Sequence, residues 1–327
     1  MNTKSGFMKF VKDNSIWAVF VAMFIAATIL SKNFLTVANI RSVLETESII
    51  GILAVGLMWC ILSRGIDISV GSIVALSSVI VASLAQVSTY TAAMYPGLNF
   101  PWPLVVVIAV AIGAAFGAFN GAIIAYTKIP AFIATLGTQL ICRAAAQLYT
   151  NAYPVPELKP GLKALGQGSL FGKIPIIIII FVIFVVISGF MLTQTRFGKN
   201  VYAIGGNADA ARVAGINVEK NITLVYLWSG ICAGMAGVLL AARAGAGNSA
   251  AGVGFETDAI AAATVGGTSH TGGVARISGV IAGILILGVA KNIMVLTGVN
   301  AYWQQIVKGL IIIVAVVLDM RKNIVKN

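Results

Sequence analysis

The sequence predicts an all-α polytopic membrane protein with about ten transmembrane helices, and three observations support this fold class. The chain of 327 residues is 59% hydrophobic and only 10% charged, which is outside the usual range of soluble domains. Apolar runs near the roughly 20 residues that a helix needs to cross a bilayer recur along the chain. Polar, basic or Pro/Gly-rich stretches separate them. We therefore expect one transmembrane domain, residues 1–327, in membrane lipid and without a soluble module.

The order of apolar and polar stretches predicts the individual spans. The first apolar run follows Lys4, Lys9 and Lys12 and precedes no clear cleavage site, so we interpret it as an uncleaved span that begins inside. Pro130 is placed in the first turn of a later span. The apolar piece before Gly266 is so short that, at about 1.5 Å per residue, it covers half a bilayer and predicts a half-helix. The predicted spans are 16–31, 48–63, 70–87, 103–126, 130–150, 174–192, 221–242, 257–265, 276–296 and 301–319.

Ten crossings place both termini in the cytoplasm and predict outer loops at 32–47, 88–101, 151–173 and 243–255. Most of the 22 Lys and Arg residues then fall on the inner side, as the positive-inside rule requires. This explains the net charge of +12 without a nucleic-acid partner.

The sequence contains no pattern typical of a catalytic or metal centre. The number of cysteines is odd, and all three lie in apolar runs: Cys60, Cys142 and Cys232. The only histidine is His270. These features argue against a disulfide framework and a zinc site. No GxxxxGK[ST] loop, HExxH motif or nucleophile elbow occurs. We therefore expect no catalytic residue, no metal and no cofactor.

Two stretches suggest weak inverted repeats. GIDISVG precedes a span that holds Gly113, Gly117 and Gly121, and GFETDAIAAATVGG precedes one that holds Gly279 and Gly283. The corresponding segments run in opposite directions, as in many transporters. The glycine spacing itself, which recurs at 230 and 234, predicts close helix packing.

A polar interruption at 193–220 predicts a docking element on the inner face. Asn207 can cap a short helix, and Gly215 can end it in a left-handed conformation. A helix over 208–214 is too short to be stable alone in water, and its surface is mostly alanine. We expect another protein to dock here; the alternative is a solvated loop with a frayed turn. The candidate coupling residues are Asn207, Ala208, Asp209, Ala210, Ala211, Arg212, Val213, Ala214 and Gly215.

Polar residues in and beside the spans are candidates for a solute pathway. Capping is the main alternative for Asp67, Glu256 and Asp258, and Asp67 can also pair with Arg64. Arg143 and Lys291 should face protein or water, because an ionised group in lipid is costly. The pathway candidates are Asp67, Ser69, Asn120, Gln139, Glu256, Asp258, Thr264 and Asn292.

These candidates are mostly amides and hydroxyls, which suits a neutral polar solute. Three functions stay open from the residues alone. They are a transporter powered by a partner, an ion-coupled secondary transporter of a small neutral polar solute, and a membrane enzyme for a lipid-linked substrate.

Five segments carry a resemblance to a known family. They are GIDISVGS, IPAFIATLGT, TRFGKNVYAIGGNADAARVAGINV, DAIAAATVGGTSHTGG and GVNAYWQQIVKGLIIIVAVVLDMRK. The chain resembles the membrane permease subunit of bacterial ATP-binding-cassette importers for monosaccharides. Within that group it is most similar to the galactose/methyl-galactoside permeases, with the ribose permeases next.

The resemblance implies several partners. Two permease copies would form the pathway as a homodimer, a soluble sugar-binding protein would dock outside, and a tandem ATPase would bind residues 207–217 as a coupling helix. ATP hydrolysis would belong to the partner, so this chain would not be an enzyme. The resemblance also implies an arrangement like that of vitamin B12 importers, in a bacterial inner membrane. The transported sugar stays open, with galactose, methyl-galactoside or glucose favoured over ribose.

Overall fold

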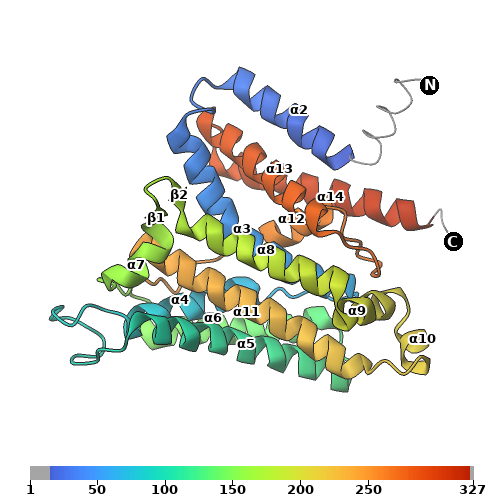
Figure 1. The fold of residues 1–327 in the computed structure, drawn as a ribbon, viewed down its shortest axis with the longest axis horizontal. Helices are drawn as coiled ribbons and strands as arrows, with labels where there is room; N and C mark the ends of the chain where they lie inside the picture. The colour runs from blue at the N-terminus through green and yellow to red at the C-terminus, as the bar shows by residue number, and fades with distance from the viewer. Residues whose placement is uncertain (1–14, 325–327) are drawn as a thin grey trace.

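The computed structural model describes residues 15–324 and confirms the all-α class (Figure 1). The predicted basic residues Lys4, Lys9, Lys12 and Lys326 lie outside this range. Two-residue strands β1 (Ser169–Leu170) and β2 (Ile174–Pro175) form a small antiparallel hairpin. The helices are α2 Ser15–Leu30, α3 Val37–Leu62, α4 Val70–Leu84, α5 Trp102–Thr127, α6 Ala131–Thr150, α7 Pro160–Gln167, α8 Ile176–Gln194, α9 Arg196–Gly206, α10 Ala208–Val213, α11 Val218–Ala244, α12 Phe255–Val265, α13 Ile277–Leu296 and α14 Ala301–Ile324.

Six of the described helices are long and apolar enough to cross a membrane: α3, α5, α8, α11, α13 and α14. The apolar helices α2 and α4 are shorter. This pattern is that of a polytopic membrane protein. The count of ten crossings stays a prediction.

The structure corrects the predicted loops at three places. Helix α3 starts at Val37 behind a Thr36 cap, so most of the predicted outer loop 32–47 is helical. The predicted outer loop 151–173 contains α7. The polar interruption 193–220 contains α9 as well as the predicted short helix. In each case, charged or polar side chains interrupted the apolar pattern by which we identified spans.

Glycines allow α5 and α11 to pack closely, as their spacing predicted. A Cβ atom on Gly230 would lie 2.2 Å from the carbonyl oxygen of Gly113. A Cβ on Gly117 would lie 2.3 Å from the carbonyl oxygen of Tyr226. Helix α13 approaches the end of α12 in the same way at Gly283, where a Cβ would lie 2.1 Å from Ala262 O. Only glycine permits these approaches of one backbone to another.

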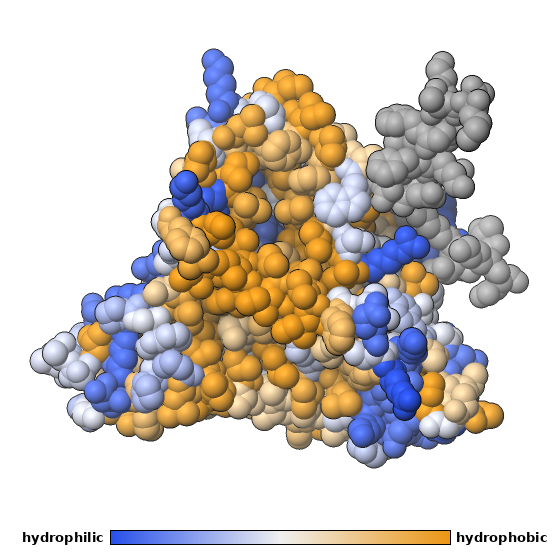
Figure 2. Space-filling view, in the orientation of Figure 1, coloured by the Kyte–Doolittle hydropathy of each residue, from blue (hydrophilic) through white to orange (hydrophobic). Residues whose placement is uncertain are grey.

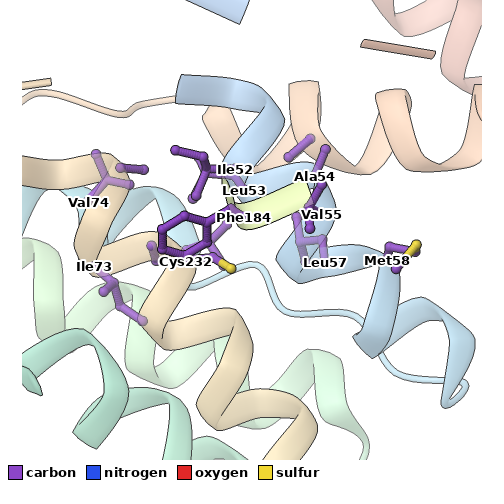
Figure 3. Close-up of a cluster of buried hydrophobic side chains, with 14 of the residues drawn as sticks. Ile52, Leu53, Ala54, Val55, Leu57, Met58, Ile73, Val74, Phe184 and Cys232 are labelled. Carbon is purple, nitrogen blue, oxygen red and sulfur yellow. The ribbon is translucent and has the colours of Figure 1, made fainter. Parts of the chain in front are cut away.

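Helix α3 forms the centre of the hydrophobic core (Figure 3). Its residues from Glu47 to Leu62 are all buried. Phe184 of α8 and Cys232 of α11 pack in the same cluster. The indole of Trp59 donates a 2.6 Å hydrogen bond to Ser188 Oγ, which satisfies its polar group inside the core.

Polar connections gather at the two ends of the helices. At one end, which we call the α7 end, bridges join Gln86 to Leu158 and Val155 to Gly247. At the other, the α9–α10 end, Gly273 N donates to Leu62 O at 3.0 Å. Figure 2 shows one side of the molecule, with hydrophobic side chains over its middle and hydrophilic ones gathered toward its left and right ends. The predicted topology makes the α7 end external and the α9–α10 end cytoplasmic.

Candidate translocation and coupling sites

Two short helices begin next to each other inside the bundle. Helix α4 has 15 residues and α12 has 11. A Cβ on Gly71, in the first turn of α4, would lie 2.5 Å from Gly252 O and 2.2 Å from Glu256 Oε2 at the start of α12. From this point α4 runs to the α7 end, whereas α12 runs to the α9–α10 end. Their N-termini direct two partial positive charges at one region, as in transporters with discontinuous helices.

Arg143 of α6 supports the chain where it enters α12. Its Nη1 donates to Ser249 O at 2.7 Å and to Ala251 O at 2.6 Å, and its Nη2 donates to Gly71 O at 3.3 Å. The segment 243–255 is therefore partly buried within the chain, and its placement on the outer side stays a prediction. Arg143 does face protein, as expected. Its guanidinium satisfies carbonyl groups that have no partner in a regular helix.

Asp67 lies in a closed polar network beneath the start of α4. Its Oδ1 accepts from Ser69 N at 3.1 Å and Ser69 Oγ at 2.6 Å, and its Oδ2 accepts from Ser229 Oγ at 2.9 Å. Asn120 donates to Ser69 Oγ at 2.9 Å and accepts from Thr138. All three pathway candidates here, Asp67, Ser69 and Asn120, are fully buried.

In this conformation these three residues hold the loop before α4 in place. The predicted pair between Asp67 and Arg64 is absent among the described ion pairs, because Arg64 turns toward α9. A pathway role for Asp67, Ser69 and Asn120 stays a prediction.

The acidic residues Glu256 and Asp258 lie in the first turn of α12. Gly254 holds the N-cap position and supplies no capping side chain. Asp258 instead pairs with Lys308 of α14 at 2.7 Å. Glu256 Oε2 is buried and makes no hydrogen bond within the described residues. Glu256 therefore lies where two helix N-termini, α12 and α4, favour negative charge, and Asp258 lies in the first turn of α12.

The other three pathway candidates make no hydrogen bonds with these groups or with one another among the described residues. Thr264 Oγ1 is 2.8 Å from His270 Nε2, where burial lowers the pKa of His270. Asn292 exchanges hydrogen bonds of 2.9 and 2.8 Å with Asn39. Gln139 lies half-buried on α6. The eight candidates therefore belong to more than one group of hydrogen-bonded residues, and their pathway role stays a prediction.

Helix α10 has the caps that its sequence predicts. Asn207 Oδ1 accepts from the N–H groups of Asp209 and Ala210, both at 3.0 Å. At the other end Gly215 adopts a φ of +83°. Ile216 N then donates to Ala211 O at 3.0 Å, which completes a Schellman motif. The six-residue helix is thus held at both ends.

The structure changes which face of α10 is free. Ala211 is only 4% exposed and packs with Ile204 and Val218. It belongs to the interior of this chain, so we no longer expect a partner to contact it. Val213, in contrast, is 91% exposed. Arg212 forms an ion pair with Glu219, which ties α10 to the start of α11.

Arg64 connects α9, which precedes α10, to the loop before α4. No pattern in the sequence indicated this role. Its Nε donates to Gly205 O at 2.7 Å and its Nη2 to Gly206 O at 2.5 Å, at the C-terminus of α9. Its φ of 65° lies in the left-handed region. Tyr202 of α9 also donates to Ala275 O, at 2.6 Å. Helix α9 thus contacts the loop before α4 and the loop after α12.

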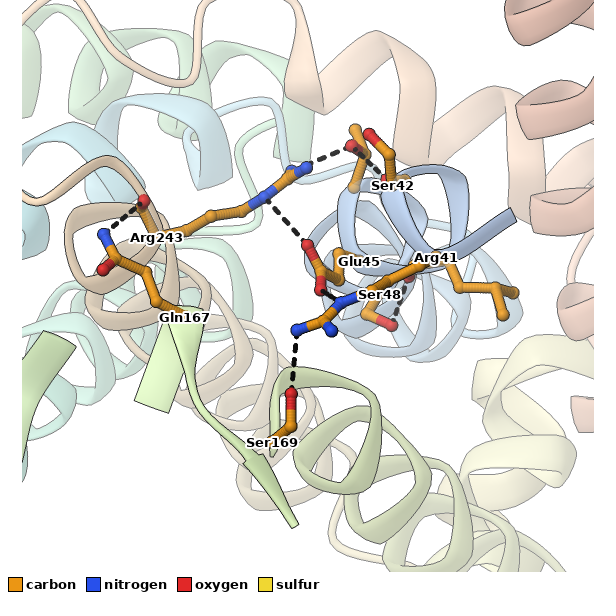
Figure 4. Close-up of polar contacts among 9 residues, drawn as sticks. Arg41, Ser42, Glu45, Ser48, Gln167, Ser169 and Arg243 are labelled. Carbon is orange, nitrogen blue, oxygen red and sulfur yellow. Dashed lines mark hydrogen bonds and ion pairs between the residues drawn. The ribbon is translucent and has the colours of Figure 1, made fainter. Parts of the chain in front are cut away.

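A polar cluster joins three elements at the α7 end (Figure 4). Arg41 donates to Glu45 at 2.8 Å and to Ser169 at 2.8 Å. Arg243 lies 3.8 Å from Glu45 and donates to Thr46 at 2.8 Å. These contacts link α3, β1 and α11. The links from α3 to β1 and to α11 could not be predicted from the sequence, because those partners are 128 and 197 residues apart along the chain.

Relatives with assigned transport roles resemble this chain over nearly its whole length. The galactose/methyl galactoside import permease protein MglC of Escherichia coli K12 is 36% identical over 326 residues, 98% of this chain and 97% of that protein. The ribose import permease protein RbsC of the same strain is 39% identical over 96% of this chain and 95% of its own length. The D-allose transport system permease protein AlsC is 39% identical over 93% and 89%.

No solved structure matches the chain. The family described as "Branched-chain amino acid transport system / permease component" matches residues 39–316. These residues include the two short helices, the Arg64 contacts and α10. The chain belongs to this family of membrane permease components.

Proposed function

We propose that this chain is the membrane-spanning subunit of an ATP-driven importer that translocates a monosaccharide. The similarity to galactose, ribose and allose permeases, at 36–39% identity over at least 93% of the chain, carries the proposal. Galactose, methyl-galactoside or glucose are the favoured solutes, with ribose next. A soluble binding protein delivers the sugar, two permease copies form the pathway, and a tandem ATPase hydrolyses ATP. The inner membrane of a bacterium is the proposed location, with both termini cytoplasmic.

The contacts around α9 support a route for mechanical coupling. The exposed face of α10, which includes Val213, is the proposed contact with the ATPase. Movement of α10 acts on α9, which directly precedes it along the chain. Arg64 and Tyr202 then transmit the movement to the loops before α4 and after α12. Because both short helices begin inside the bundle, a small shift of these loops changes the region where their N-termini meet.

Reconstitution tests this proposal. The permease is purified with the ATPase and binding protein encoded beside it and inserted into proteoliposomes. Labelled D-galactose, D-glucose, D-ribose and D-allose are then offered one at a time. We expect ATP-dependent uptake of at least one sugar, and no uptake when the ATPase carries an inactive catalytic carboxylate.

Uptake driven by a proton or sodium gradient without ATP would contradict the proposal and favour an ion-coupled secondary transporter. Uptake by the permease alone, with no ATPase present, would contradict it as well. Hydrolysis of a lipid-linked substrate in the same vesicles would instead favour a membrane enzyme.

A further inference from the structure

A cavity of about 260 Å³, with an apolar lining that several polar residues interrupt, lies between α3, α12, α13 and α14. It is distinct from the closed network around Asp67. Most membrane-embedded helix contacts are apolar, so this concentration of polar groups needs a reason. The polar residues that line it are Glu47, Asp258, Lys291, Gln304, Gln305 and Lys308.

Glu47 is the group that most needs an explanation. It lies in the middle of α3 and is only 7% exposed. Within residues 15–324, no hydrogen bond or ion pair reaches its carboxylate. A buried carboxylate without a hydrogen bond is costly. The charge of Lys291 offsets part of this cost, and the carboxylate borders the cavity. Its oxygens are therefore available to accept hydrogen bonds from a bound molecule.

The charges around the cavity sum to zero, which selects the class of ligand. Glu47 and Asp258 are balanced by Lys291 and Lys308, and the second pair is already joined at 2.7 Å. A bound ion would therefore give the cavity a net charge. A neutral ligand can use these groups as donors and acceptors without changing the charge of the site.

The remaining lining fits a small ring with hydroxyl groups. The amide of Gln305 offers both a donor and an acceptor, and Phe255 supplies an apolar surface beside it. The volume is below the roughly 300–1,000 Å³ of pockets for drug-sized ligands. A single sugar ring matches this size and this mixture of polar and apolar surfaces.

We infer that this cavity binds a neutral polyhydroxylated solute of one sugar ring on its way through the protein, with Glu47 accepting hydrogen bonds from its hydroxyl groups. The inference deepens the proposed function and rests on it for the identity of the solute. Asp258 is the one earlier pathway candidate that borders this site. The inference adds five lining residues to the pathway: Glu47, Lys291, Gln304, Gln305 and Lys308.

A cysteine-protection experiment tests binding without requiring transport. The full-length chain carries only Cys60, Cys142 and Cys232, all buried. Gln305→Cys places a reactive thiol in the cavity, and Glu157→Cys places one on an exposed outer loop. Each variant is reacted with a charged methanethiosulfonate in nanodiscs, with and without D-galactose or D-ribose at high millimolar concentration. We expect the sugar to slow modification at position 305 and to leave position 157 unchanged.

The role of Glu47 is tested in the same assay. Adding Glu47→Ala to Gln305→Cys removes a charged acceptor, so the sugar concentration that gives half protection should rise roughly 10- to 100-fold. Glu157→Gln is the matched control because it removes a carboxylate that does not border the cavity. Should the Glu47→Ala protein be poorly folded, Lys291→Met provides a second change in the lining, with the same expected direction.

The outcomes separate this inference from the proposed function. Protection at position 305 that is weakened by Glu47→Ala supports the inference even when the reconstituted complex fails to import the sugar. ATP-dependent import by the wild-type complex, with no protection at position 305 by the imported sugar and unchanged import by Glu47→Ala, overturns it. Equal protection at positions 305 and 157 overturns it too.

Discussion

At the scale of single residues, the absence of side chains at the contact of α5 and α11 decides how closely the two helices approach. A Cβ on Gly113 would lie 2.4 Å from Gly230 O, and a Cβ on Gly230 would lie 2.2 Å from Gly113 O. Both obstacles are backbone atoms, which cannot rotate away. Lipid gives little apolar drive for helix association, so such contacts supply much of the stability.

Gly230→Val should therefore destabilise the folded chain. Overpacking of a core costs about 1–3 kcal/mol, and we expect at least this much because two backbones must separate. Gly137→Val is the control, since nothing lies within 4 Å of a Cβ there. Thermal unfolding followed by size-exclusion chromatography in detergent measures both. Equal melting temperatures for the two variants would contradict this account of the α5–α11 contact.

Arg64 shows what one polar residue does between distant segments. Its two hydrogen bonds to the last carbonyls of α9 are charge-assisted, and such bonds contribute about 1.5–3 kcal/mol each at most. Arg64→Ala should uncouple ATP hydrolysis from sugar uptake in the reconstituted complex, with the permease still folded and the ATPase still bound.

Arg64→Lys supplies a conservative comparison. Lysine reaches the same carbonyls with a single point charge instead of a planar fork, so we expect it to restore part of the uptake. Uptake per ATP hydrolysed is the quantity to compare. Wild-type coupling in Arg64→Ala would remove Arg64 from the proposed route.

At the scale of elements, α10 has an inner face that packs on its own chain and an outer face that is free. Ala211 and Val213 lie two residues apart, yet one is 4% and the other 91% exposed. The caps at Asn207 and Gly215 hold this orientation. The sequence predicted the caps correctly. It did not predict which alanine faces inward, because six residues are too few for a hydrophobic period.

Val213→Asp and Ala211→Asp should therefore fail in different ways. Val213→Asp should leave the permease folded and greatly reduce the amount of ATPase that co-purifies with it. Ala211→Asp buries a charge among Ile204 and Val218, so it should lower the stability of the permease itself. Co-purification and detergent melting curves distinguish the two. Normal ATPase binding by Val213→Asp would contradict the docking role of α10.

For the short helices α4 and α12, the sequence predicted a local feature, the length of α12, but not the contact between the two helices. The length of the apolar piece 257–265 predicted a half-helix, and α12 spans Phe255–Val265. Its sequence does not reveal that Gly252 and Glu256 lie against Gly71 of α4. That contact depends on Arg143, which binds carbonyl groups about a hundred residues away.

At the scale of the whole molecule, large apolar side chains remain exposed along α5, α6, α8 and α14. A soluble protein of this size rarely exposes so much apolar surface. In a membrane the same surface contacts lipid, and in the proposed homodimer part of it contacts the second copy. The polar ends in Figure 2 then lie near the two membrane faces.

The predicted topology is open to a direct test with introduced cysteines. The native cysteines are buried, so Glu157→Cys and Ala210→Cys each add one accessible thiol at opposite ends of the bundle. In intact cells, an impermeant maleimide should label position 157 and reach position 210 only after the membrane is permeabilised. Labelling of position 210 in intact cells would invert the proposed orientation and remove α10 from the cytoplasm.

The sequence by itself determined the fold class, most helix positions, the glycine faces and the capped helix near the centre of the chain. These features depend on composition and on neighbours a few residues apart. Only the tertiary structure decided that Glu47 borders a cavity, that Asp67 is enclosed, and that Arg64 reaches α9. Each depends on side chains that meet across helices far apart in the chain, and no local pattern of hydrophobicity or charge encodes which helices become neighbours.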